Sequence, residues 1–241
     1  MSGVRVVALQ MLYNASSEMH QFLETMLLFV AGLFPIVNPL GVAPIFLSMT
    51  DGESAETRNL LARRIAINGL LLLLTSLFIG SHVLAFFGIT LPVVKIGGGL
   101  VVTFSGWTIL NQKSEPREAG REQVGRGRSI LTSAFYPLTL PLTVGPGSIA
   151  TTLTLGTQLA THFDAQPAQA LVLNFVAAVT GIVLIAVSIY LSFRFADALG
   201  RLLGETGTSV LVRLSAFILL CIGIQIIWNG VNELLTPLLH R

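Results

Sequence analysis

The stretch that decides the fold is VNPLGVAPIF, residues 37–46, together with a second stretch of the same kind, PLTLPLTVGPGSI, residues 137–149. Each is rich in proline and glycine and lies at mid-length of a long uncharged run. Proline lacks a backbone N–H and clashes with the preceding turn, so each stretch is predicted to interrupt a helix. In hydrocarbon, unpaired backbone groups are tolerated only where protein or a water-lined cavity covers them. Two interruptions at corresponding places of two halves are typical of the central site of a transporter.

The composition places the whole chain in a membrane. Of 241 residues, 53% are hydrophobic and only 11% are charged, and the mean hydropathy is +0.78. A soluble domain carries about 25% charged residues. Several uncharged runs exceed the ~20 residues that a spanning helix needs, and together they leave no room for a soluble domain. The six runs without Asp, Glu, Lys or Arg are 25–50, 65–94, 96–112, 129–163, 165–193 and 214–232.

The basic residues indicate how the chain crosses the membrane. The net charge is only +2, which gives no indication of a nucleic-acid partner. Lys and Arg are concentrated after the first, third and fifth hydrophobic units, and the positive-inside rule places these loops in the cytoplasm and both termini outside. These residues are Arg58, Arg63, Arg64, Lys113, Arg117, Arg121, Arg126, Arg128, Arg194, Arg201 and Arg213.

A hydrophilic linker, KSEPREAGREQVGRGR at 113–128, divides the chain near its middle. Each side holds three hydrophobic units, so the second half must enter the membrane in the opposite sense to the first. We therefore predict an all-α membrane protein with six transmembrane helices arranged as two inverted three-helix repeats, 21–112 and 129–241. Residues 1–20 are interpreted as an amphipathic extension, with a cleaved signal peptide as the alternative.

Internal similarity supports the duplication. Asn38–Pro39 aligns with Gly145–Pro146, and Asn68 aligns with Asn174 at nearly the same offset. The run 129–163 would be about 52 Å long as a straight helix, against about 30 Å of hydrocarbon, so it must be broken, strongly tilted or partly re-entrant. The first helix of each repeat is thus predicted to be broken by its Pro/Gly motif.

The two breaks are the first candidates for binding. Exposed N–H groups at the start of a half-helix suit a carboxylate, and exposed C=O groups at the end of another suit an ammonium group or a metal cation. Asn38 can cap a helix that begins at Pro39. The alternative is a pair of kinks that only shape the bundle. The residues proposed at the breaks are Asn38, Pro39, Gly41, Thr143, Gly145, Pro146, Gly147 and Ser148, and Thr151 and Thr152 add further hydroxyls beside the second break.

Four polar residues inside the hydrophobic units need a separate explanation. Asn68 and Asn174 each offer a donor and an acceptor, which suits either a bound solute or a hydrogen bond between helices. We include both asparagines among the candidate binding residues. Lys95 and Arg213 begin the third and sixth units, where extension toward the lipid headgroups and a role as a gating or anion-attracting pair are both open.

Missing residue types narrow the function further. No Asp or Glu lies deep in a hydrophobic unit, so a cationic substrate would lack a countercharge and a buried carboxylate is not available for proton relay. The sequence has no plausible catalytic triad or carboxylate pair, and His82 and His162 lack partners at metal-ligand spacing. We therefore expect no enzyme activity, no cofactor and no metal site. Cys221 is the single cysteine, so no disulfide can form within the chain.

Two motifs in combination resemble the MarC family of bacterial inner-membrane proteins: FPIVNPLGVAPIFLSMT at 34–50 and PLTLPLTVGPGSIATTL at 137–153. Residues 89–110 and 212–231 also fit, and the resemblance covers about residues 20–236. It implies six helices in two inverted repeats. It also implies membership of a group that includes transporters of small neutral amino acids such as glycine and alanine. The family's name refers to antibiotic resistance, which by itself does not indicate drug export.

The expected function is secondary transport of a small neutral amino acid, or a similar zwitterionic or neutral solute, across the bacterial inner membrane. The alternatives are a non-transporting membrane scaffold or stress-linked protein, and an exporter of other small compounds including antibiotics. We expect the protein to be surrounded by the lipid bilayer. Coupling to Na⁺ or H⁺, the direction of transport and assembly into a homo-oligomer are left open by the sequence.

Overall fold

The computed structural model describes residues 2–111, 133–161 and 168–239, and in these ranges the chain is helical and contains no strand. Among the described residues, five helical stretches are long and apolar enough to span a bilayer: Ser16–Met49, Ala55–Gly80, Leu91–Asn111, Ala170–Arg194 and Ser209–Thr236. The prediction of an all-helical, multi-pass membrane protein is confirmed. The predicted linker 113–128 and His162 lie outside the described residues.

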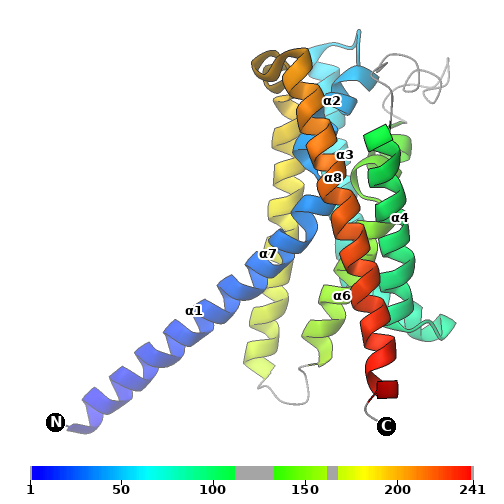
Figure 1. Ribbon diagram of the computed structural model, residues 1–241. Coiled ribbons are helices and arrows are strands. Elements are labelled where there is room, and N and C mark those ends of the chain that lie inside the picture. Colours follow the sequence, from blue (N-terminus) through cyan, green and yellow to red (C-terminus); the bar gives the residue numbers. More distant parts are fainter. Residues whose placement is uncertain (1, 112–132, 162–167, 240–241) are drawn as a thin grey trace.

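Eight helical elements follow one another in the part of the chain that the structure describes (Figure 1). α1 begins at Ser2, so the expected N-terminal extension is continuous with the first membrane unit. The fourth hydrophobic unit consists of two short elements, a wide irregular turn η2 and the helix α6. The elements are α1 (Ser2–Val37), α2 (Pro39–Met49), α3 (Ala55–Phe87), α4 (Leu91–Asn111), η2 (Phe135–Thr143), α6 (Pro146–Thr161), α7 (Ala168–Arg194) and α8 (Ala196–Leu239).

Successive units run in opposite directions. α1–α2, α4 and α7 run one way, and α3, η2–α6 and α8 run the other way (Figure 1). Contacts between α3 and α7 agree with this, because Arg194 bonds Asn59 near the start of α3 while Phe175 stacks on Phe78 further along it. The described ends of α1 and α8 consequently lie at the same end of the bundle.

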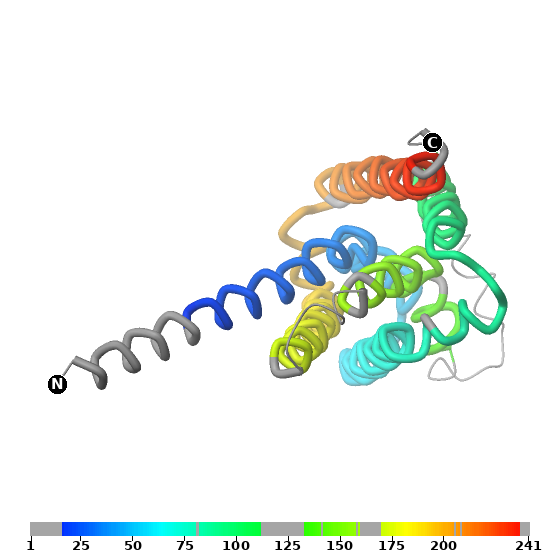
Figure 2. Tube along the Cα trace, turned by 90° about the horizontal axis from the view of Figure 1, so that it is seen from below, coloured from blue at the N-terminus to red at the C-terminus, as the bar shows by residue number. Residues whose placement is uncertain are grey.

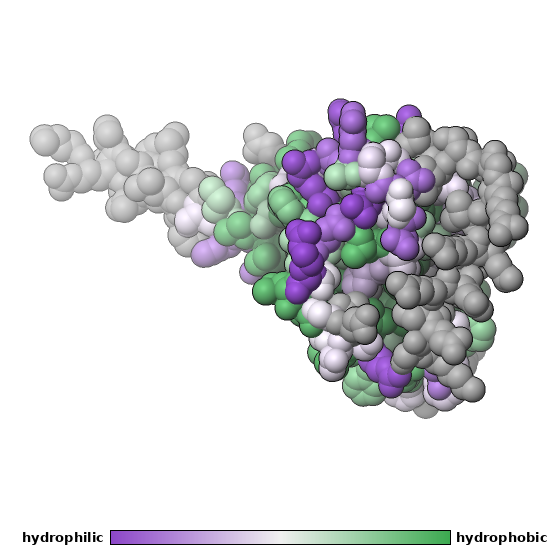
Figure 3. All heavy atoms as spheres, turned by 90° about the horizontal axis from the view of Figure 1, so that it is seen from above, coloured by the Kyte–Doolittle hydropathy of each residue, from purple (hydrophilic) through white to green (hydrophobic). Residues whose placement is uncertain are grey.

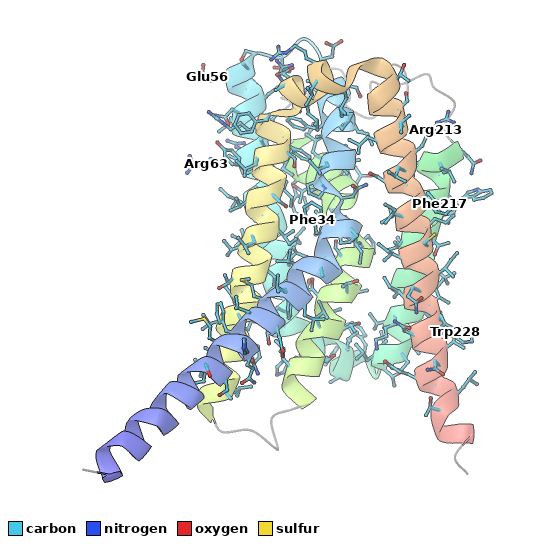
Figure 4. The ribbon with its side chains drawn as sticks, turned by 60° about the vertical axis from the view of Figure 1, so that its left-hand side comes forward. Phe34, Glu56, Arg63, Arg213, Phe217 and Trp228 are labelled. Carbon is cyan, nitrogen blue, oxygen red and sulfur yellow. The ribbon has the colours of Figure 1, made fainter. Side chains whose placement is uncertain are left out.

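The opposite end of the bundle carries most of the described basic side chains. Figure 3 shows hydrophilic residues gathered on this end, and Figure 4 shows Arg63 and Arg213 near it. Arg58 Nη2 lies 3.1 Å from Asp197 Oδ2, which joins the start of α3 to the start of α8. Beyond this contact α8 turns sharply at Gly204, whose φ of 63° is one that glycine adopts readily.

The core lies among α1, α2, α3, α6 and α7. Phe29 and Leu33 of α1 are fully buried, and Phe46 of α2 stacks on Phe193 of α7 with ring centroids 4.6 Å apart. Large apolar side chains also cover the outer surface, for example Phe217 and Trp228, which point away from the bundle (Figure 4). Helices that are apolar on all sides are typical of a protein whose outer surface meets lipid.

α4 and α8 form a close antiparallel pair at the side of this core (Figure 2). A Cβ atom on Gly106 would lie 2.7 Å from the backbone N of Leu220, and one on Gly99 would lie 2.8 Å from the carbonyl O of Gly223. Small residues allow this approach, as is common in membrane helix pairs.

Lys95 lies in the contact between α4 and α8 and is only 6% exposed. It forms an ion pair with Glu233 of α8. Extension of Lys95 to the headgroups is therefore the wrong interpretation, because its ammonium group is held inside the protein by a carboxylate. A gating pair of Lys95 and Arg213 is also wrong: α8 runs antiparallel to α4, so Gly230 packs against Lys95 and the exposed Arg213 lies toward the other end.

Candidate functional site

The first break is a single residue, Asn38, between α1 and α2. Its φ of 47° and ψ of 55° are left-handed, a conformation in which asparagine is several-fold enriched. The Asn38 side chain accepts a hydrogen bond from the N–H of Gly41 at 3.2 Å, and Pro39 is the first residue of α2. A Cβ on Gly41 would lie 2.4 Å from Asn38 Nδ2. Glycine at 41 therefore leaves the space that this cap requires.

The same arrangement frees carbonyl groups at the end of α1. The helical partner of the Pro35 carbonyl would be the N–H of residue 39, and Pro39 has none. The helical partner of the Val37 carbonyl, the N–H of Gly41, donates to Asn38 Oδ1 instead. The end of α1 therefore presents carbonyl oxygens, and with them the negative end of a helix dipole, at the height of the break.

The second break begins in η2, where hydroxyl groups take over part of the backbone hydrogen bonding. Thr139 Oγ1 donates to the carbonyl of Ala134 at 2.6 Å, and Thr143 Oγ1 donates to that of Leu138 at 2.7 Å. Val144 is extended, and α6 begins at Pro146. Gly147 and Ser148 are buried in the first turn of α6, where backbone N–H groups have no acceptor within the helix.

The two breaks lie next to each other. A Cβ on Gly147 would overlap Val102 of α4 and would be 3.6 Å from Cγ2 of Ile36, and one on Gly32 would be 3.8 Å from Cγ2 of Thr151. The last turn of α1 and the first turn of α6 thus run side by side in opposite directions, near mid-height of the bundle, where Figure 4 shows Phe34. We refer to residues 35–41 and 143–148 together as the paired breaks.

The electrostatics of the paired breaks follow from this geometry. The carbonyl end of α1 lies beside the N–H end of α6, so groups of opposite polarity face one small region. A molecule with one ammonium and one carboxylate group could match both ends. Among the described residues, no cluster of three or more His, Cys, Asp or Glu side chains that could hold a metal is present.

The two candidate asparagines are placed differently. Asn68 of α3 reaches the second break, because its Nδ2 lies 3.5 Å from Thr139 Oγ1 and the neighbouring Gly69 faces Val144. Asn174 of α7 accepts a hydrogen bond from Thr25 Oγ1 of α1 at 3.3 Å.

Asn174 lies at another height in the bundle. The adjacent Phe175 stacks on Phe78, which follows Asn68 by ten residues along α3, or about 15 Å of helix. The structure therefore brings Asn68 to η2, beside the second break, and leaves Asn174 away from both breaks.

The hydroxyls near the second break also fall into two groups. Thr143, Ser148 and Thr152 donate to backbone carbonyls of their own segments. The oxygen of Thr151 is buried and has no hydrogen-bond partner in the part of the chain that the structure describes. The sequence alone could not separate Thr151 from its neighbour Thr152.

Known proteins resemble the chain over nearly its whole length. A family model described as "MarC family integral membrane protein" matches residues 23–235. Membrane protein YhcE of Escherichia coli strain K12 is 31% identical over 212 residues, which are 88% of this chain and 94% of YhcE. Inner membrane protein MarC of Escherichia coli O1:K1 is 31% identical over 210 residues, 84% of this chain and 92% of that protein. No solved structure matches the chain.

Proposed function

Because the chain belongs to the MarC family of integral membrane proteins and two of its hydrophobic units break beside each other, we propose that it is a secondary transporter. Its solute is a small neutral amino acid or a similar zwitterionic or neutral molecule, which it moves across the bacterial inner membrane. An inner-membrane location agrees with the name of its relative MarC.

The paired breaks are the single observation that carries this proposal. Carbonyl groups at the end of α1 suit the ammonium group of an amino acid, and N–H groups at the start of α6 suit its carboxylate. Asn68 adds an amide from α3. Residues 30–41 and 143–152 contain no charged residue, so a solute with net charge would find no countercharge of opposite sign in these segments.

Alternating access is the proposed mechanism. In this proposal α1–α4 and η2–α8 are two inverted three-helix repeats, each with a broken first unit. The opposite directions of equivalent units support it, as do the antiparallel contacts of α3 with α7 and of α4 with α8. Rocking of one repeat against the other would open the paired breaks to either side of the membrane in turn.

The coupling ion and the orientation in the membrane complete the proposal. A coupling Na⁺ would suit the freed carbonyl oxygens of Pro35 and Val37, and a coupling proton is the alternative. Arg63 and Arg213 lie toward the same end of the bundle (Figure 4), which supports a cytoplasmic position for that end, with both termini outside.

Counterflow in proteoliposomes tests the function directly. Proteoliposomes that contain the wild-type protein and are loaded with unlabelled glycine or alanine are expected to accumulate the labelled amino acid from outside. Pro146→Ala, which restores a backbone N–H at the start of α6, is expected to lose most of this exchange. Gly97→Ala is the control, because a Cβ at Gly97 meets nothing within 4 Å.

Three results would speak against the proposal. Absence of wild-type counterflow for every small neutral solute tried would favour the scaffold alternative. A Pro146→Ala variant that folds less well but exchanges at the wild-type rate would reduce the second break to a kink. Exchange of antibiotics without exchange of amino acids would favour the exporter alternative.

A further inference from the structure

We propose that a site for the phosphate of an anionic phospholipid lies where the beginning of α3 meets the end of α7. Four polar residues form it, and we call them the α3–α7 seam: Asn59, Arg63, Tyr190 and Arg194. Figure 4 shows Arg63 nearer the end of the bundle than Phe34, which marks the height of the paired breaks. The inference therefore does not depend on the proposed transport function.

The first observation is that Arg194 is held in place. Its Nη1 donates to Asn59 Oδ1 at 2.7 Å and to the Tyr190 hydroxyl oxygen at 3.3 Å. The Tyr190 hydroxyl donates to the same Asn59 oxygen at 3.1 Å. A guanidinium group has five N–H donors, and those on Nη2 and Nε of Arg194 have no partner among the described residues. The exposed Arg194 thus offers oriented, unused donors at the surface.

Arg63 supplies a second positive charge close to the first. It follows Asn59 by four residues, so both lie on one face of α3. Because α7 runs antiparallel to α3, Tyr190, one turn before Arg194, lies at the height of Arg63. Arg63 points outward beside α7 (Figure 4) and makes no hydrogen bond or ion pair within the part of the chain that the structure describes. Its charge is available to a ligand at the seam.

Both arginines stand at the boundary of the apolar part of the bundle. The uncharged run of α3 begins at residue 65, and that of α7 ends at residue 193. From the seam toward mid-height, exposed apolar side chains continue on both helices: Ile67, Leu71, Val183 and Val187. A phospholipid has the same order of groups, with a charged phosphate followed by acyl chains. The surface therefore matches a lipid molecule rather than a free anion.

Charge selects among the lipids. Asn59 and Tyr190 are neutral, so the seam carries the charge of its two guanidinium groups. Guanidinium groups bind phosphate oxygens through charge-assisted hydrogen bonds. Two carboxylates lie nearby, but Glu56 belongs to the first turn of α3 and Asp197 is paired with Arg58. A headgroup that carries its own ammonium group would be repelled, which favours phosphatidylglycerol over a zwitterionic lipid.

Lipid titration of the purified full chain tests the site. The protein in detergent is unfolded by heat at increasing concentrations of dioleoylphosphatidylglycerol, and the concentration that gives half-maximal stabilisation is an apparent Kd. Arg63→Gln and Arg194→Gln are each expected to raise this Kd about fivefold to twentyfold, because each removes charge-assisted hydrogen bonds. Arg201→Gln, which removes an exposed arginine near the start of α8, is the matched control and should stay within about twofold.

Two further probes identify the source of the phosphate. Dioleoylphosphatidylcholine has the same chains and a phosphate but adds a quaternary ammonium group, and its apparent Kd is expected to be at least about fivefold higher. Inorganic phosphate has no acyl chains. It is expected neither to stabilise the protein at the concentrations used for the lipid nor to displace that lipid.

Four results would overturn the inference. An unchanged Kd in both seam variants would remove the arginines from lipid binding. An equal loss in Arg201→Gln would mean that the lipid responds to the general positive charge of this end. Equal binding of the two lipids would show that the headgroup charge does not matter. Stabilisation by inorganic phosphate alone, equal to that by the lipid, would make the seam a site for a free anion.

Arg63 keeps the test separate from the stability of the fold. Loss of Arg194 also removes its hydrogen bond to Asn59, whereas Arg63 has no described partner to lose. Arg63→Lys retains the charge but not the planar fork of donors, so it should weaken lipid binding less than Arg63→Gln does. Equal weakening by the two substitutions would contradict a contact that depends on the positive charge.

Discussion

Asn38 combines two roles that few residues can fill together. It takes a left-handed conformation, and its side chain caps α2 through the N–H of Gly41. Alanine at this position would remove the cap, and its positive φ would be an unfavourable backbone conformation that destabilises the fold. The shape of the first break is therefore concentrated in one side chain.

This leads to the first residue-scale prediction. Asn38→Ala is expected to lower the free energy of unfolding by about 2–3 kcal/mol, of which about 1–2 comes from the left-handed backbone and about 1 from the cap. Asn38→Gly should cost less than about 1 kcal/mol, because glycine accepts positive φ and substitutes tolerably at a cap. Denaturant unfolding in detergent measures both. Equal losses for the two variants would show that the backbone conformation does not matter.

Lys95 and Glu233 support a second prediction at this scale. Removing the carboxylate with Glu233→Gln leaves a buried ammonium group without its partner, while Glu233 itself is 44% exposed. We expect a loss of about 1–3 kcal/mol, below the full cost of breaking a wholly buried pair. In a double-mutant cycle, Lys95→Met should cancel most of this loss. Strictly additive effects of the two substitutions would mean that the ion pair contributes nothing to stability.

At the scale of elements, the α4–α8 pair depends on glycines at its contact. A methyl group on Gly99 would meet Gly223 O and Ile227 of α8 within 3 Å, whereas one on the nearby Gly97 would meet nothing within 4 Å. The same substitution should therefore have opposite effects at two positions two residues apart.

The third prediction uses this contrast. Gly99→Ala is expected to destabilise the protein by about 1–3 kcal/mol through overpacking. Gly97→Ala is expected to be neutral or to stabilise by up to about 1 kcal/mol, because alanine is the better helix former. Thermal unfolding of the two variants in one detergent gives the comparison. Similar melting temperatures would contradict so close an approach of α4 to α8.

At the scale of the whole molecule, the distribution of basic side chains predicts the orientation in the membrane. Basic side chains gather at the end that holds Arg63 and Glu56, and the described ends of α1 and α8 lie at the other end. The positive-inside rule assigns the first end to the cytoplasm.

The fourth prediction tests this orientation. In a Cys221→Ser background, Glu56→Cys and Thr90→Cys place single exposed thiols at opposite ends of the bundle. A membrane-impermeant thiol reagent applied to intact spheroplasts should label Thr90→Cys and should label Glu56→Cys only after lysis. The reverse pattern would invert the assignment of both termini.

Sequence patterns predicted local features well and long-range contacts poorly. The lengths of the apolar runs predicted a helical membrane protein, because hydrocarbon forces each crossing segment to satisfy its own backbone. The capping pattern Asn38–Pro39 likewise predicted where α2 begins. The pairing of Lys95 with Glu233 was not predicted, since these residues are 138 positions apart and neither stands out as a partner of the other.

The candidate site shows the same division. Asn68 and Asn174 align at nearly the same offset as the two proline-containing motifs, yet only Asn68 lies beside the second break. Of the hydroxyls beside the second break, the sequence offered no reason to prefer Thr151, because threonine on any face of a helix looks the same in a sequence. Only the three-dimensional structure shows that the Thr152 hydroxyl has a partner and the Thr151 oxygen has none among the described residues.

What the sequence determined by itself was that two proline-containing segments would interrupt helices, because a proline lacks its N–H in every surrounding. It did not determine at which residue, since Pro35 and Pro44 lie inside α1 and α2. It also determined that the chain must lie in a membrane, because so few charges and such long apolar runs leave no other solvent. Only the tertiary structure decided that the last turn of α1 meets the first turn of α6, and hence which polar groups share one small region. That contact depends on the packing of side chains more than a hundred residues apart, which no local pattern encodes.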